Sequence, residues 1–445
     1  MKYAEYKPTG TTWVESIPTA WDCKKISALF SQRKTKVSDT DYPALSVAKI
    51  GVVPQLANAA KSNDSGNRKL VCAGDFVINS RSDRKGSCGV SERDGSVSLI
   101  NIVLTPRHEW NNRYVHYLLR SQPFSEEYYH YGRGIVADLW TTRYSEMKSI
   151  LLPVPPREEQ QQIVRYLDWQ VSKINKLIAA KQQQIMLLKE LLQKQIDNEF
   201  SLLTDKYRDT ITVIGRHIAC IESGTSVNSE YGSATATDYG VLATSCVYGN
   251  VFRISENKKV SLRDYSRLKC PVKARTVIVS RMNTPELVGA CGYSSEANAG
   301  VFLPDRLWQI SFDKHVLPQY AWRYLSSRKV QMWFSAIATG SSSTMKNITK
   351  PQLKAVMMPC PDIDTQKKII DIINAFSCSC QKAIDLLAEQ ISALHELRPR
   401  LISDVVTGQI DVRNIAIPDF ELVDEIDTDE ESPDEEVEPS EVDEQ

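Results

Sequence analysis

The chain repeats itself at a fixed offset, and this repeat limits the folds open to it more than any other feature. The segment Leu152-Pro153-Val154-Pro155 has a counterpart 206 residues later in Met358-Pro359-Cys360-Pro361. The same offset, without a gap, also pairs Tyr114 with Tyr320, Leu119 with Leu325, Gln160 with Gln366, Ile178 with Ile384 and Leu191 with Leu397. Further upstream, residues 77–81 (VINSR) resemble residues 277–281 (VIVSR) at a slightly shorter offset. The repeat unit is therefore a whole domain followed by a helix.

Short β-branched runs, such as Asp75 to Ile78 and Thr276 to Val279, alternate with Gly, Ser and Asn turns and short helical patches in each domain. We therefore expect an α/β protein whose two domains form a pseudo-two-fold repeat. The expected divisions are 1–151 for an N-terminal segment and the first domain, 152–203 for a first helical spacer, 204–357 for the second domain, 358–414 for a second helical spacer, and 415–445 for an acidic tail.

Each helical spacer follows a Pro-x-Pro stop and carries a narrow apolar stripe. The stripes recur at three- and four-residue steps, which is typical of a coiled-coil seam. Their members are Val171, Ile174, Ile178, Ile185, Leu188 and Leu192 in the first copy, and Cys380, Ile384, Leu387, Ile391, Leu394 and Leu401 in the second. We expect the two helices to pack on each other in antiparallel fashion; the alternative is one helix packed on each domain.

Charge is distributed unevenly along the chain. Residues 419–445 hold 15 Asp or Glu and no Lys or Arg, whereas the whole chain has a net charge of -1. The body is therefore strongly basic, as expected of a protein that binds a polyanion. The tail lacks the apolar residues that would offset ordering entropy, so we expect it to be disordered.

Other features exclude whole classes of protein. The sequence has no apolar run of membrane-spanning length and no apolar signal-peptide core near its start, so we expect a cytoplasmic protein. Its ten cysteines are scattered and are expected to be reduced thiols, and its six histidines form no pair at metal-ligand spacing. The Gly-Lys dipeptide of a phosphate-binding Walker loop is absent from the sequence, and we expect no metal site.

Three segments resemble the DNA specificity (S) subunit of type I restriction-modification systems. Residues 9–21 (TGTTWVESIPTAW) are similar to the start common in that family, and residues 153–163 (PVPPREEQQQI) are similar to the motif that opens each of its conserved helical regions. Residues 401–413 (LISDVVTGQIDVR) resemble the end of the second conserved region. With the repeat, the resemblance covers residues 3 to 413. The second motif copy, residues 359–366 (PCPDIDTQ), departs from the pattern at Asp362 and Thr365, and the acidic tail is not a general family feature.

The resemblance implies a non-catalytic subunit in which each α/β domain is a target-recognition domain. It implies double-stranded DNA as a partner and a bipartite, asymmetric target. It also implies two methyltransferase subunits docked on the helices, which in turn recruit restriction and translocase subunits in defence against phage. S-adenosylmethionine, ATP and magnesium would belong to those partners, with no cofactor in this chain.

The residues expected to contact DNA lie in polar loops at matching repeat positions. Arg and Asn side chains can bond to guanine and adenine edges, while Lys and Ser more often hold phosphates. The candidates are Arg81, Arg84, Lys85, Arg133 and Arg143 in the first half, and Arg281, Asn283, Ser342, Lys346 and Asn347 in the second.

Alternative functions remain open at this point. A methylation-only or phage-exclusion system would use a subunit with the same motifs. A coiled-coil scaffold with two protein-binding lobes would explain the repeat and the seam but not the basic body. An autonomous restriction enzyme would need catalytic motifs, of which this sequence has none that is complete.

Overall fold

The computed structural model describes residues 2–55, 66–107, 110–134, 140–230, 232–235, 237–340 and 345–423. The chain forms two compact units: unit 1 comprises Met1–Gln182 and Ala388–Gln445, and unit 2 comprises Gln183–Leu387. Unit 2 is thus inserted into the sequence of unit 1. Among the helices of the described ranges, none has the length and apolarity that a membrane crossing requires.

The central strand of unit 1 is β9 (Phe76–Asn79), and all four of its residues are buried. Its aromatic and β-branched side chains favour a strand that is covered on both faces. A four-stranded sheet has the order β10 (Cys88–Val90), β9 (Phe76–Asn79), β12 (Asn101–Pro106) and β4 (Phe30–Arg33). A three-stranded sheet has the order β11 (Gly95–Val97), β8 (Arg68–Val71) and β5 (Lys36–Val37). The two-stranded pairs are β1 (Tyr6–Pro8) with β2 (Ser16–Pro18), β3 (Asp22–Lys25) with β13 (Leu151–Val154), and β6 (Leu45–Ala48) with β7 (Gly51–Pro54). The short helices are α1 (Ile26–Leu29), α2 (Asn112–Arg120), α3 (Gln122–His130) and α4 (Tyr144–Met147).

Unit 2 repeats this plan around β19, which is also completely buried. Its first four-stranded sheet has the order β15 (Ile218–Ser223), β23 (Leu307–Phe312), β19 (Thr276–Ser280) and β21 (Cys291–Ser294). The second has the order β17 (Asn257–Lys259), β16 (Gly240–Leu242), β22 (Asn298–Phe302) and β18 (Pro271–Val272). The two-stranded pairs are β14 (Ile211–Val213) with β25 (Met357–Pro359), and β20 (Met282–Asn283) with β24 (Lys346–Asn347). The short helices are α6 (Pro318–Leu325), α7 (Arg328–Ile337) and α8 (Lys350–Lys354).

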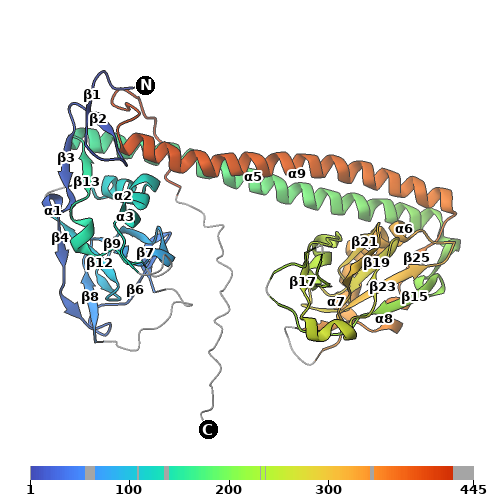
Figure 1. The fold of residues 1–445 in the computed structure, drawn as a ribbon. Helices are drawn as coiled ribbons and strands as arrows, with labels where there is room; N and C mark the ends of the chain where they lie inside the picture. Colours follow the sequence, from blue (N-terminus) through green and yellow to red (C-terminus); the bar gives the residue numbers. More distant parts are fainter. Residues whose placement is uncertain are drawn as a thin grey trace, which may run out of the picture. The chain divides into compact units, whose positions relative to one another are not determined.

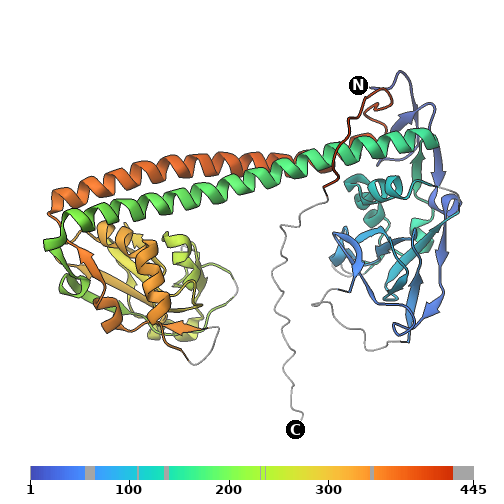
Figure 2. The same cartoon turned by 180° about the vertical axis from the view of Figure 1, so that it is seen from behind.

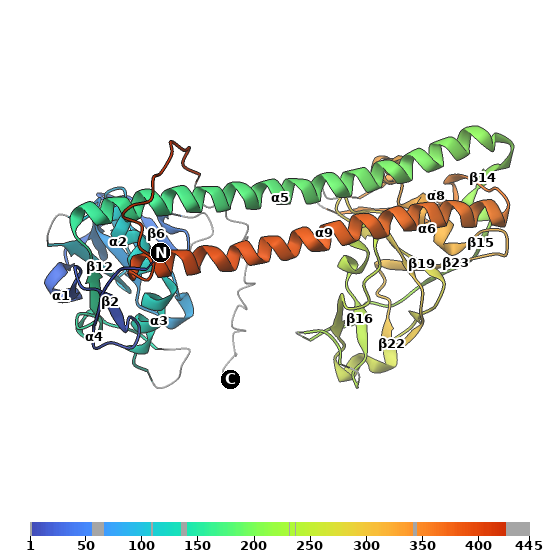
Figure 3. The same ribbon diagram turned by 90° about the horizontal axis from the view of Figure 1, so that it is seen from above.

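Two long helices link the units: α5 (Arg157–Lys206), of 50 residues, and α9 (Ile363–Val406), of 44 residues. They lie side by side, as Figures 1 and 3 show and as the reverse view in Figure 2 repeats. In unit 1 they pack antiparallel, because Asn175 bonds to Arg398 (3.0 Å) while the later Lys181 bonds to the earlier Gln390 (2.5 Å). In unit 2, Ile196 and Phe200 of α5 share a core with Ile369 and Ile373 of α9.

The predicted seam is confirmed. All its members are buried or half-buried, whereas leucines beside it, such as Leu177, Leu187 and Leu386, are about half exposed. The expected fold class is therefore confirmed: a mixed α/β protein with two repeated domains and two long antiparallel helices.

The last part of α9 closes the core of unit 1. Val405, Val406 and Val412 share that core with Trp21, which is completely buried. Gln409 donates a hydrogen bond to the carbonyl of Ser16 (3.1 Å). Gly408 has φ of 77°, and a Cβ atom there would lie only 2.5 Å from Cδ of Pro18. The family-like segments at residues 9–21 and 401–413 thus pack against each other.

Residues after α9 lie along α5. The Gln162 amide donates to the carbonyls of Val412 (3.0 Å) and Ile415 (2.9 Å). Further along, the Val423 backbone N–H donates to Ser172 Oγ (3.0 Å), and its carbonyl accepts from Asn175 Nδ2 (3.0 Å). Residues 415–423 of the expected acidic tail are therefore ordered on the helix, and 424–445 lie outside the described residues.

Candidate nucleic-acid interface

The two predicted loops of unit 1 meet beyond the end of β9. Arg81 and Arg133 both form isolated antiparallel bridges with Thr141. The backbone N–H of Ser82 donates to the carbonyl of Trp140 (3.0 Å), and that of Thr142 donates to the carbonyl of Ser80 (2.9 Å). The extension of the strand and the later loop therefore form one edge, defined here as the unit 1 edge: residues 80–85, 132–134 and 140–143.

The corresponding loops of unit 2 meet in the same way. β20 pairs with β24, so that Asn283 faces Lys346 and Met282 faces Asn347. Thr339 forms a bridge with Asn347, and their backbones exchange hydrogen bonds of 3.0 and 2.8 Å. Residues 281–283, 339–340 and 345–347 are defined here as the unit 2 edge.

The register of the paired strands differs by one residue from the alignment of the two repeat copies. The alignment of VINSR with VIVSR pairs Arg81 with Arg281, but the backbone contacts differ. Cys88 pairs with Ile78 in unit 1, whereas its counterpart Cys291 pairs with Val279. The equivalent of Arg81 is therefore Met282, and the equivalent of Arg281 is Ser80. A slip of one residue reverses the face on which a strand side chain lies, so the two arginines have different surroundings.

The cationic candidates of unit 1 are all exposed: Arg81, Arg84, Lys85, Arg133 and Arg143. Arg84 lies 4.0 Å from the carboxylate of Asp83, and the Lys85 ammonium lies 5.7 Å from the ring centroid of Tyr129. Neither contact removes its cation from water. These side chains can therefore reach a phosphate or a base edge without breaking a buried interaction.

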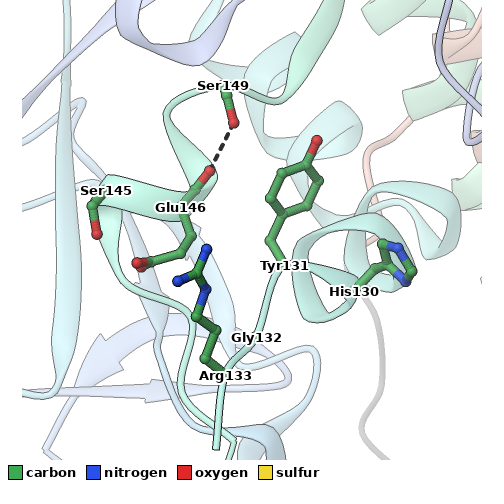
Figure 4. A pocket seen from close by; sticks show the side chains of 7 residues that line it. All are labelled: His130, Tyr131, Gly132, Arg133, Ser145, Glu146 and Ser149. Carbon is green, nitrogen blue, oxygen red and sulfur yellow. Dashed lines mark hydrogen bonds between the residues drawn. The ribbon is translucent and has the colours of Figure 1, made fainter.

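Arg133 also lines a depression of about 530 Å³ whose other side is formed by α4 (Figure 4). Glu146 lies across from it and accepts a hydrogen bond from the Arg143 backbone N–H (2.9 Å), and Ser149 donates to the Glu146 carbonyl (2.9 Å). Burial raises the pKa of the Glu146 carboxyl, but hydrogen bonds from Ser145 and Arg143, together with the charge of Arg133, make the net shift downward. The Glu146 carboxyl is therefore anionic at neutral pH, and this anion and the Arg133 cation line the same depression.

The candidates of unit 2 are less available. Arg281 donates from Nε to the carbonyl of Asp305 (2.6 Å), and its side chain is 26% exposed. Asn283 is buried, and its amide donates to Tyr248 and to Ser280 (both 3.3 Å). Lys346 and Asn347 are half-buried, and Ser342 lies outside the described residues. The Asn347 Oδ1 atom is buried without a hydrogen-bond partner among the described residues.

The structural role of the two motif glutamines, Gln160 and Gln366, was not predicted from the sequence. Gln160 accepts a hydrogen bond from the Asn111 backbone N–H (3.2 Å), and its counterpart Gln366 accepts one from that of Leu317 (2.9 Å). Each also donates to the carbonyl of a preceding proline, Pro155 (3.0 Å) or Pro361 (2.9 Å). Both glutamines are buried, so each ties its long helix to its own domain. Their identical position in the two repeat copies was the available signal.

No group of three His, Cys, Asp or Glu side chains that could hold a metal ion occurs within the described ranges. Both edges are instead assembled from strand ends, loops and exposed polar groups, an arrangement suited to recognition of a surface.

Comparison with known proteins agrees with this assessment. Residues 218–392 match the family described as the type I restriction modification DNA specificity domain. A structure solved in a study of complex assembly and conformational transition of the type I R-M system is similar over 88% of this chain and 99% of its own, with 13% identity and a TM-score of 0.57. The HsdS subunit from Thermoanaerobacter tengcongensis matches over 88% of this chain and 98% of its own, with 15% identity and a TM-score of 0.47. No curated protein matches.

The matched residues 218–392 span most of unit 2 and much of α9. The internal repeat extends the same plan to unit 1, and the likeness to the first solved structure shows that the fold is shared over nearly all of that chain. Residues 218–392 are therefore similar to the type I restriction modification DNA specificity domain, and the fold of most of the chain is similar to that of the first solved structure.

Proposed function

We propose that each unit reads one part of a split, asymmetric DNA target, and that this chain is the non-catalytic recognition subunit of its complex. The observation that carries the proposal is the edge that is built twice with different side chains. Both edges use the same backbone pairing, at Arg81 and Thr141 in unit 1 and at Met282 and Asn347 in unit 2. One scaffold with two unlike surfaces is what an asymmetric target requires.

The unit 1 edge supplies the exposed cations Arg81, Arg84, Lys85, Arg133 and Arg143. The unit 2 edge supplies Lys346 and Asn347, while Arg281 and Asn283 support its shape through their contacts within the unit. An arginine that forms two hydrogen bonds to a base edge favours the correct base over a wrong one by about 1–3 kcal/mol, whereas contacts to phosphates add affinity without sequence preference.

The long helices offer the surface for methyltransferase subunits. On unit 1, Leu177 and Leu397 are 46% and 49% exposed, and on unit 2, Leu187 and Leu191 are 53% and 49% exposed. Large apolar side chains in such numbers beside a filled seam are typical of a surface that a partner covers. We propose two methyltransferase subunits as these partners, with restriction and translocase subunits joining through them. S-adenosylmethionine, ATP and magnesium would be bound by those subunits.

The direct test is methylome sequencing of cells that express this chain with its methyltransferase subunit. A motif of two short sequences separated by unread base pairs is the expected result, and one continuous motif would contradict the proposal. Arg81→Ala should relax one part of the motif and Asn347→Ala should relax the other part. Arg208→Ala is the matched control, because Arg208 is 76% exposed and lies outside both edges.

The restriction subunits are tested separately. Unmethylated phage DNA should be cut by the complete complex only when ATP and magnesium are supplied, and the purified chain alone should cut nothing. Methylation of the split motif without any restriction would assign the chain to a methylation-only system.

A further inference from the structure

Trp140 is the only tryptophan among the described residues that is exposed, at 39% of its surface. Tryptophan is usually largely buried, since its indole ring offers a large apolar area and one N–H donor. On the unit 1 edge, about two fifths of the surface of this residue therefore faces solvent.

The backbone around Trp140 is held firmly. Its carbonyl accepts the hydrogen bond from Ser82, and the next residue, Thr141, is bridged on both sides by Arg81 and Arg133. Thr142, which follows Thr141, is 1% exposed, and its hydroxyl donates a hydrogen bond to the Tyr128 carbonyl (3.1 Å). A rigid support of this kind presents the indole at a defined place and lowers the entropy that a contact would cost.

The backbone partner of Trp140 is Ser82, and three cations lie on the same edge. Arg81 and Arg133, which bridge Thr141, are both exposed, and Arg143 follows two residues after it. Exposed aromatic rings interleaved with cations are the combination that binds nucleic acids through base stacking and phosphate contacts together.

The repeat shows that this combination is confined to unit 1. Thr141 is equivalent to Asn347, so the equivalent of Trp140 is Lys346. In the same register, Met282 replaces Arg81, Thr339 replaces Arg133 and Thr349 replaces Arg143. The unit 2 edge therefore has neither the aromatic ring nor the cluster of arginines.

The mode of contact follows from the shape of the side chain. One indole N–H cannot form the bidentate pair that distinguishes base edges in the major groove. The ring face can stack on a base, which in a duplex requires a base step to open, as apolar wedges do in proteins that kink DNA.

We propose that Trp140 inserts against a base step in the half-site read by unit 1, and that unit 2 has no equivalent wedge. The inference rests on the proposed function, because it assumes that unit 1 binds DNA. The two halves of the target would then be read by different means: the first with local unstacking, the second without.

The test uses the complex with its methyltransferase subunit and duplexes that carry 2-aminopurine in either half-site. Fluorescence of the probe should rise on binding when it lies at one step of the unit 1 half-site, and should stay low at the steps of the other half-site. The methylated adenine and its neighbours are left unlabelled in both half-sites, because the methyltransferase extrudes that base. Trp140→Ala should abolish the rise and weaken binding about 5- to 100-fold, as expected for loss of one stacked base. Trp140→Phe should retain most of the fluorescence rise and most of the binding affinity. Lys346→Ala, at the equivalent position, should lower affinity for all sequences and reduce the salt dependence.

The half-site of unit 1 is identified independently as the one that Arg81→Ala relaxes. If Trp140→Ala leaves affinity and fluorescence unchanged while Arg81→Ala still relaxes that half-site, the wedge is refuted and the proposed function stands. Retained DNA binding with loss of the methyltransferase subunit would make Trp140 a protein contact and also refute it. If neither variant affects binding to any duplex, the proposed function itself fails.

Discussion

Arg281 Nε donates a 2.6 Å hydrogen bond to the backbone carbonyl of Asp305, and its guanidinium lies 3.8 Å from the Asp305 carboxylate. We therefore expect Arg281→Ala to lower the free energy of unfolding of unit 2 by about 1 kcal/mol, the usual net value of such a bond. The recognised DNA sequence should not change. Thermal denaturation and methylome sequencing of the same variant would check both statements. Relaxation of one half-site without loss of stability would show instead that Arg281 reads a base.

Gln160 and Gln366 provide a pair of equivalent tests. Replacement of either by Ala leaves a half-buried backbone N–H without its acceptor, at Asn111 or at Leu317, which costs about 1 kcal/mol. Hydrogen exchange should show faster opening in unit 1 for Gln160→Ala and in unit 2 for Gln366→Ala. Gln160→Glu keeps the acceptor and loses only the donor to Pro155, so it should fall between the wild type and the alanine variant. Equal effects on both units from one variant would contradict this assignment.

We expect the buried ring of His116 to make the stability of unit 1 sensitive to acid. Burial, together with the charges of Arg120 and Arg113, lowers the pKa of its ring from 6.5 to about 3. Its Nε2 lies 2.7 Å from an Arg120 nitrogen and its Nδ1 lies 3.4 Å from the Val90 backbone N–H, so both ring nitrogens face donors, which disfavours the doubly protonated ring. Between pH 3 and 6.5 the unfolded chain binds more protons at this site, and stability falls as the pH drops through that range.

The expected loss at His116 is about 1 kcal/mol between pH 7.5 and pH 5.5. Comparison of unfolding free energies at the two pH values for the wild type and His116→Gln would measure it, since other titrating groups affect both proteins alike. The variant should show the smaller pH dependence. An identical pH dependence in the two proteins would mean that the ring is protonated in the folded state.

Helix length should set the spacing of the two half-sites. Four residues inserted near Lys181 in α5, matched by four near Gln390 in α9, would lengthen both helices by about 6 Å and nearly preserve the facing of the seam. Because base pairs rise by about 3.4 Å, the unread spacer should grow by about one or two pairs, with both half-site sequences unchanged. Methylome sequencing would report the new spacing. Methylation at the original spacing would show that the helices do not determine it.

Much of the architecture could be predicted from the repeat. An ungapped offset places Gln160 on Gln366 and Ile178 on Ile384, and this requires two copies of a domain with its helix. The seam followed from the spacing of apolar residues, because buried helix positions recur with the helical period. The pairing of Thr141 with Arg81 at the strand end was not predicted, because the sequence indicated only that the two loops are polar and lie at matching repeat positions.

The identity of the available side chains could not be predicted from the sequence. The strings VINSR and VIVSR look equivalent, but a one-residue difference in register leaves Arg81 exposed and directs Arg281 to Asp305. Register depends on cross-strand partners that are distant in sequence, which the motif does not contain. The burial of Asn283 likewise depends on Tyr248, which lies outside every segment that the repeat aligned.

The insertion of unit 2 into the sequence of unit 1 imposes an order on synthesis. Trp21 and Ile17 emerge early from the ribosome, but their core is completed by Val405, Val406 and Val412, which are made almost last. Unit 2 is contiguous from Gln183 to Leu387 and has its full core before then. Unit 2 can thus fold while unit 1 still exposes apolar side chains that promote aggregation. A premature stop before residue 405 would therefore leave a folded unit 2 attached to an incomplete unit 1, and such a fragment would be a substrate for chaperones and proteases.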